Sequence, residues 1–294
     1  MLSLQTNAAA LTAQASVNNT QKALATSQTR LGTGYRINSA MDDAAGLQIA
    51  TRLNAQTRGM AVAMRNTQNG ISMMQTAEGA FNEVTDMLTR MKDLATEAAS
   101  ASSTAADQTA MQSEYDALGT ELTNIMKNTS FGGANLFSSG TTVDGTGGKL
   151  SAAMDFQIGA SSGEKMTVDV STQLTAVTTA LAGVSKEYAT TPAAGTELTA
   201  AGSANTMIDT LSSAIASVST LRSSLGAASN RLDHVYNNLS NMSTNTTQAK
   251  SRIMDVDYAS ETANMTSKQM LLQASTTMLK QSSSTSQLVL SLLQ

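Results

Sequence analysis

The chain has 294 residues, a net charge of −4 and an aromatic content of only 3%, with no tryptophan and no cysteine. The lack of cysteine excludes disulfides, thiolate metal sites and cysteine nucleophiles. The acidic balance argues against nucleic-acid binding. Ala, Ser, Thr, Asn, Gln and Met are plentiful, which suits thin packed helices better than a sandwich or barrel. We therefore expect a mainly α fold.

The first residues do not look like a secretory leader. No Lys or Arg precedes Lys22, and polar residues interrupt the early apolar positions, whereas a cleaved leader needs a basic start and a continuous apolar run. No stretch approaches the about 20 apolar residues of a membrane span. We expect no membrane association, and any export by a route that cleaves no leader of the usual kind.

Residues 4–31 are predicted to form a helix with a thin apolar stripe. Its large apolar residues are Leu4, Leu11, Val17, Leu24 and Leu31. So few large side chains do not stabilise an isolated helix of this length, so we expect disorder here until a partner covers the stripe. Gly32 and Gly34 end the pattern. Asp42 and Asp43 then stand where a helix start favours carboxylates.

A long second helix is predicted from about residue 44 to residue 99. Apolar or small residues recur at sevens from Leu53 to Ala95, with a second set three positions further on, which is the pattern of packed helices. A bend can occur at Asn69 and Gly70. Asp107 is placed to cap a third helix, ending near residue 128, which a short connection makes antiparallel to the second.

The middle of the chain has a different character. Glycine, Ser and Thr dominate residues 131–151, and apolar and polar residues alternate near 154–171, which predicts a β-hairpin. Residues 171–204 hold the only proline, Pro192, and few large apolar side chains. We expect them to form an exposed loop or short variable insert outside any core.

The strongest periodic pattern runs from residue 208 to residue 242 and continues to Ile253. Its apolar residues alternate at steps of three and four without a proline, which predicts one unbroken helix with a single coiled-coil stripe. That stripe needs a partner. We interpret its main residues as an assembly seam, namely Leu211, Val218, Leu225, Leu232 and Leu239.

Residues 257–293 again carry apolar positions at sevens, and residues 288–293 are the most apolar run of the chain. Such a run, if exposed, is an aggregation or assembly site. Because both ends carry stripes without a partner, we expect the two terminal helices to pair. The predicted terminal assembly residues are Leu4, Leu11, Leu24, Leu31, Leu272, Leu279, Leu292 and Leu293.

The sequence offers few candidates for catalysis. His234 is the only histidine, and a solvated or interhelical contact is its more ordinary role. Residues 42–43, with Asp255 and Asp257, suggest a carboxylate metal site, but helix starts and interhelical pairing explain them more simply. A glycine-rich segment before Leu150 fails as a phosphate loop, because Ser or Thr must follow the lysine. We expect no catalytic residue, metal or cofactor, and no enzyme.

Two segments at opposite ends resemble the signatures of bacterial flagellins. Residues 30–50 read RLGTGYRINSAMDDAAGLQIA and resemble the N-terminal signature, and residues 251–261 read SRIMDVDYASE and resemble the C-terminal one. Residues 289–293 resemble the C-terminal end of flagellin sequences. The chain departs from the family at Ser286, where many members carry a proline, so the last helix is expected to run further.

The resemblance implies a secreted, extracellular subunit that polymerises into the bacterial flagellar filament for motility. Its inner coiled-coil domain would be residues 1–41 with 256–294, and its helical rod domain residues 42–170 with 205–255. The hairpin would belong to the rod, and residues 171–204 would be the short insert. A hook-associated protein at the junction of hook and filament is the alternative.

The resemblance also implies partners. These are further copies of the chain, an export chaperone, hook-associated and cap proteins, and the flagellin-recognising Toll-like receptor. The family's receptor motif matches Arg90, Leu94 and Glu114, which would supply a forked donor, an apolar anchor and a carboxylate. The alternative role of this patch is subunit packing. No nucleic-acid partner is expected.

Overall fold

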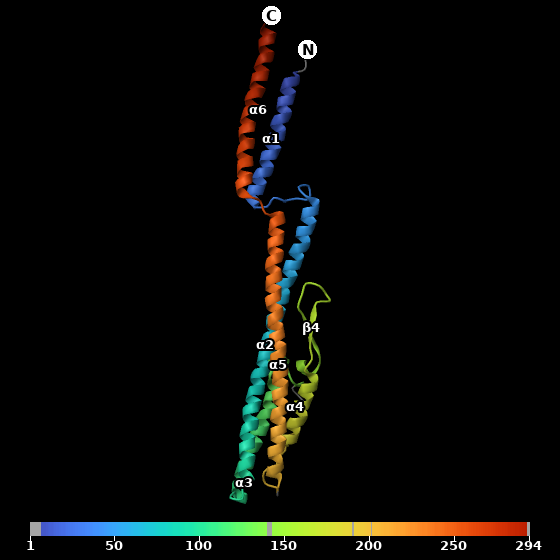
Figure 1. Cartoon of the computed structure of the whole chain (residues 1–294), viewed down its shortest axis with the longest axis vertical. Coiled ribbons are helices and arrows are strands. Elements are labelled where there is room, and N and C mark those ends of the chain that lie inside the picture. The colour runs from blue at the N-terminus through green and yellow to red at the C-terminus, as the bar shows by residue number, and fades with distance from the viewer. Residues whose placement is uncertain (1–6, 140–142, 190, 201, 293–294) are drawn as a thin grey trace. The chain divides into compact units, whose positions relative to one another are not determined.

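The computed structural model describes residues 7–139, 143–189, 191–200 and 202–292. These residues are mainly helical (Figure 1), which confirms the predicted fold class. The helices are α1 (Ala8–Thr33), α2 (Ala44–Ala98), α3 (Ala105–Asn128), α4 (Ser171–Val184), α5 (Ser203–Met254) and α6 (Tyr258–Leu292). The chain divides into a terminal unit, Met1–Thr57 with Thr244–Gln294, and a central unit, Arg58–Ser243. The sequence placed these divisions at residues 41 and 255.

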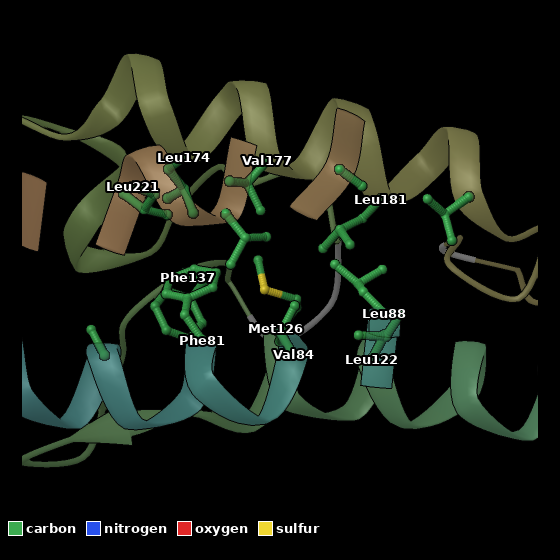
Figure 2. Packing of buried hydrophobic residues seen from close by; sticks show 14 of the residues in the cluster. Phe81, Val84, Leu88, Leu122, Met126, Phe137, Leu174, Val177, Leu181 and Leu221 are labelled. Atoms are coloured by element: carbon green, nitrogen blue, oxygen red, sulfur yellow. The ribbon is translucent and has the colours of Figure 1, made fainter. Parts of the chain in front are cut away.

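The central unit has a hydrophobic core to which four helices contribute. Figure 2 shows side chains of α2, α3, α4 and α5 pointing into one cluster, among them Phe81, Leu122, Leu174 and Leu221. These four side chains are fully buried, and the rings of Phe81 and Phe137 lie 4.6 Å apart at 51°. Full burial of one such side chain contributes about 1.5–3 kcal/mol. This cluster is therefore the main source of the central unit's stability.

α5 is a single unbroken helix of 52 residues, as the alternation of threes and fours predicts. The residues interpreted as an assembly seam are all buried inside their own chain: Leu211, Val218, Leu225, Leu232 and Leu239. Four of them belong to the core cluster, and the fifth packs with Met60 and Ala63 of α2. The assembly interpretation is therefore wrong, because the chain itself supplies the partner of this stripe.

α2 runs through Asn69 and Gly70 without interruption. Gly70 instead marks a close approach of three elements. A Cβ at this position would lie 2.9 Å from the ring of Phe156 and 3.2 Å from Leu232. The glycine is thus explained by the packing of a strand and of α5 against α2, with no helix break.

α3 ends at Asn128 as predicted, but its cap differs from the prediction. Thr104 is the N-cap residue and accepts from the backbone N–H of Asp107, whose carboxylate accepts in return from the backbone N–H of Thr104. This reciprocal arrangement is a capping box. α3 returns along α2, since Gln108 Nε2 donates to the carbonyl of Ala98 at 3.0 Å.

Two small antiparallel hairpins follow α3. β1 (Ser130–Phe131) pairs with β2 (Ala134–Asn135), and both intervening glycines have positive φ, as a tight primed turn requires. β3 (Met154–Gln157) pairs with β4 (Lys165–Val168). The second hairpin confirms the prediction near 154–171. The first was not predicted, because two-residue strands leave almost no alternation to detect.

The expectation of an exposed loop at residues 171–204 is wrong for its first half. α4 buries Leu174, Val177 and Leu181, and Figure 2 shows these three in the core cluster. They recur at threes and fours among Ala and Thr, so few large residues suffice when every one faces inward. A short 3₁₀ turn, η1 (Lys149–Ser151), lies against α4.

Polar contacts hold the irregular segment after α4 onto α3. Burial raises the pKa of the Tyr115 phenol, which donates to the carbonyl of Val184 at 2.8 Å. Gln112 Nε2 donates to Glu197 at 2.8 Å, and its Oε1 accepts from the backbone N–H of Leu198 at 2.7 Å. Gln112 and Glu197 are both buried. Buried polar groups paired in this way keep the segment folded against the core.

The packing at Gly70 gives a test within one helix. Gly70→Ala should destabilise the protein by about 1–3 kcal/mol through overpacking, although alanine is the better helix former. Gly79→Ala, also in α2 but with no heavy atom within 4 Å of the added Cβ, should stabilise it by up to about 1 kcal/mol. Urea unfolding of both variants measures the difference. Equal effects would contradict the packing role of Gly70.

Candidate assembly surfaces

The terminal unit brings the two ends of the chain together. α1 and α6 pack side by side (Figure 1), which confirms their predicted pairing. Asn7 caps α1, and its Nδ2 donates to the carbonyl of Ser282 at 3.2 Å. The less exposed positions of each helix include a series spaced at threes and fours, namely Ala10, Ala13, Val17, Thr20, Leu24, Ser27 and Leu31 in α1, and Glu261, Met265, Lys268, Leu272, Ser275, Leu279 and Ser282 in α6.

This pair has almost no core of its own. Within residues 8–33 and 258–284 the only buried side chains are those of Ser27 and Glu261. Leu24, Leu31, Leu272 and Leu279 are half-buried. Because hydrophobic stabilisation follows the apolar area removed from water, these described parts of α1 and α6 stabilise each other weakly compared with the helices of the central unit.

Large apolar side chains lie on the outside of the pair. Leu11 of α1 and Met270, Leu271 and Met278 of α6 are exposed. Leu4 and Leu293, and the side chain of Leu292, lie outside the described residues. Leu11 was predicted as a terminal assembly residue, whereas the three α6 residues were missed because they stand off the heptad positions that sequence reasoning follows.

The threonines of α1 turn their hydroxyls onto their own helix. Each donates to the carbonyl four residues earlier, at 2.8 to 3.1 Å; they are Thr12, Thr20, Thr26, Thr29 and Thr33. This back-bonding is common for Ser and Thr in helices. It satisfies the hydroxyl without water or a second helix.

Backbone contacts join the two signature segments at the base of this pair. Tyr35 and Asp255 form an antiparallel bridge, the backbone N–H of Val256 donates to the carbonyl of Gly34 at 3.0 Å, and that of Arg36 donates to Met254 at 2.6 Å. Gly34 has a φ of 77°, where glycine avoids the strain of a side chain. Sequence reasoning missed this junction, and its only signal was the presence of both segments in the signatures.

Charged side chains reinforce the junction. Arg30 lies 3.7 Å from Asp42 and 3.9 Å from the buried Glu261. Asp42 accepts from the backbone N–H groups of Asn38 and Ser39 at 3.0 and 2.9 Å, and these hydrogen bonds hold the pKa of its carboxyl below the ordinary value. The two predicted helix-start carboxylates thus differ in role. Asp43 accepts from the backbone N–H three residues on, whereas Asp42 orders the connector.

The patch predicted from the receptor motif is only partly on the surface. Arg90 Nε donates to Glu114 at 2.8 Å, and both side chains are about half exposed, at 52% and 47%. Leu94 is 2% exposed and belongs to the core cluster. The structure therefore brings Arg90 and Glu114 together but corrects the expected role of Leu94, whose side chain packs inward and is not presented as an anchor.

The other candidate residues form no reactive cluster. His234 is exposed, and in the described part of the chain no three His, Cys, Asp or Glu residues gather as a metal site would require. None of the described helices is long and apolar enough to cross a membrane. The surfaces that stand out are the outer faces of the terminal pair and the junction.

Comparison with known proteins gives a consistent result. The family model of the bacterial flagellin N-terminal helical region matches residues 4–142, and that of the C-terminal helical region matches residues 208–293. The chain is 48% identical to polar flagellin B/D of Vibrio parahaemolyticus and 46% identical to flagellin C of Vibrio cholerae, each over 169 residues. These matches span 58% of this chain and 42% of each relative.

A solved structure shares the fold. It is described as a flagellar hook-associated protein from Vibrio parahaemolyticus, is 16% identical, and has a TM-score of 0.54 over 73% of this chain and all of that one. At this identity the likeness concerns the fold alone. The chain is mainly helical, and the helices at its two ends pair. With both helical regions present in order, this chain belongs to the bacterial flagellin family.

The lowered pKa of Asp42 predicts a local pH response. A carboxyl whose pKa is lower in the folded state than in the unfolded state stabilises the folded state at pH values above its unfolded-state pKa. This stabilisation is lost as the pH falls through the folded-state pKa. The amide resonances of Asn38 and Ser39 should therefore shift with a midpoint below 3.8, the ordinary value. Asp42→Asn should abolish this NMR titration, while Asp86→Asn, at an exposed site of α2, should not. A midpoint at or above pH 3.8 would contradict the lowered pKa of Asp42.

Proposed function

We propose that this protein is the subunit of a bacterial flagellar filament, secreted to the cell surface and used for motility. The observation that carries the proposal is the terminal pair, whose described side chains, in residues 8–33 and 258–284, form no buried apolar core and expose Leu11, Met270, Leu271 and Met278. Such faces lose free energy by packing against further copies. Membership of the flagellin family supports assembly of such copies into a filament.

The mechanism is mechanical and needs no reaction. The central unit has its own buried core and serves as the preformed part of the subunit. α1 and α6 gain most of their apolar burial only among other copies, so their ordering is coupled to assembly. Contacts between different faces of identical subunits, when they do not close into a ring, give a helical filament.

Further partners belong to the same proposal. An export chaperone would cover residues 271–293 before assembly, since this end of α6 carries exposed apolar side chains. Hook-associated and cap proteins would contact the ends of the filament. The alternative function is a hook-associated junction protein, made in few copies, which the shared fold of one such protein allows but does not favour.

Assembly gives the central test of this function. Electron microscopy after a salt jump should show long filaments of the pure protein. Deleting residues 285–294 should abolish them. Leu271→Gln with Met278→Gln should raise the critical concentration about tenfold or more, since each loses an apolar contact. Ser219→Gln, at an exposed site of α5, is the matched control. Protein that stays monomeric at high concentration would contradict the filament function.

A flagellin-recognising Toll-like receptor is proposed to read the Arg90–Glu114 pair. Both groups are half exposed, and Arg offers a forked donor. The charge swap Arg90→Glu with Glu114→Arg keeps an ion pair within the chain but exchanges the positions of the positive and negative charges that a receptor would contact. It should weaken signalling by monomer in receptor-bearing reporter cells about tenfold or more. Unchanged signalling would contradict this partner. Leu94→Ala is no substitute, because its burial predicts a loss of about 2–5 kcal/mol in stability.

A further inference from the structure

Met41 is the most exposed large apolar residue in the described part of the chain, with an exposed fraction of 97%. It stands in the connector between α1 and α2. This connector is firmly held on both sides, because Asp42 accepts from Ser39 at 2.9 Å and the Arg36 guanidinium donates to the carbonyl of Ile253 at 2.9 Å. The thioether is thus presented to water at a fixed place, where it gains no hydrophobic stabilisation within its own chain.

The same terminal unit contains a hollow of about 170 Å³ between the start of α2 and the end of α5. It is lined by Tyr35, Leu47, Ala50, Thr51, Asn54, Lys250 and Met254. The Leu, Ala and Met side chains give it apolar walls, and the volume admits several non-hydrogen atoms, since a water occupies about 30 Å³ of liquid. Met41 does not line the hollow.

Charges beside the two features are complementary. Lys250 borders the hollow, and Asp43 follows Met41 by two residues. Neither takes part in the ion pairs found among the described residues, which are Arg30–Asp42, Arg30–Glu261, Arg90–Glu114 and Lys165–Asp155. A half-buried lysine at the hollow and an exposed aspartate near the protruding methionine, both outside these ion pairs, suit a contact between two copies.

We propose that Met41 of one copy inserts into the hollow of a second copy, with Asp43 approaching Lys250 of that copy. The inference rests on the proposed polymerisation and names one of its contacts. A protruding group and a hollow at different places on one unit make a heterologous contact, which repeats from copy to copy. A single contact then covers both an exposed apolar side chain and a hollow whose walls are partly apolar.

The assembly of a variant with a truncated Met41 side chain tests the insertion. Met41→Ala should raise the critical concentration for filament formation about tenfold or more, while helix content and melting temperature of the monomer stay unchanged, because Met41 touches little in its own chain. Met242→Ala, at an exposed methionine of α5, should assemble as the wild type does. Lys250→Glu should also raise the critical concentration.

Cross-linking tests the contact directly, since the chain has no cysteine of its own. M41C and T51C variants, one of them labelled with ¹⁵N, are mixed, assembled and mildly oxidised. Mass spectrometry should find a disulfide between the two variants in filaments and not in monomers. T76C replaces T51C as the control, because Thr76 is also an exposed threonine of α2 with its hydroxyl on the preceding turn.

The outcomes separate this inference from the proposed function. A wild-type protein that forms no filaments overturns both. Wild-type filaments with normal assembly of Met41→Ala, or a cross-link no stronger with T51C than with T76C, overturn the insertion of Met41 and leave the filament function in place.

Discussion

Unequal burial of apolar surface governs this molecule. In the central unit, leucines of four helices are fully buried together with Phe81 and Phe137, and each contributes about 1.5–3 kcal/mol. In α1 and α6 the corresponding positions are half-buried, and the described part of the pair buries only a serine and a glutamate. The central unit therefore has a buried core of its own, whereas α1 and α6 would gain more hydrophobic stabilisation by packing against further protein surface.

Polar contacts supply in the terminal unit what apolar burial supplies in the central one. The bridge between Tyr35 and Asp255, the hydrogen bond from Asn7 to Ser282, and the ion pairs of Arg30 all join residues far apart in the sequence. Such contacts are directional but add little net stability, since surface ion pairs contribute about 0–1 kcal/mol and desolvation offsets the attraction in a more buried pair such as Arg30–Glu261. They define how the two ends meet without making that meeting strongly stable.

Local periodicity allowed the helices to be predicted, but not their partners. The threes and fours of α5 predicted an unbroken helix, yet whether Leu211 and Leu225 faced their own chain or another depends on distant residues. α4 was missed because Ala and Thr lower its average hydrophobicity, although Leu174, Val177 and Leu181 share one face. The burial of Leu94 was missed because a motif in the sequence does not show which other helices cover its residues.

The threonines of α1 have a consequence for how this helix meets water. Their hydroxyls are bonded to their own backbone, and in α1 only Lys22 and Arg30 carry charge, so the exposed faces of this helix are weakly charged. Anions such as sulfate, which are excluded from protein surfaces, strengthen the burial of such faces without binding to them. The ionic composition of the medium, acting with no dedicated ion site, thereby tunes how strongly these helices associate.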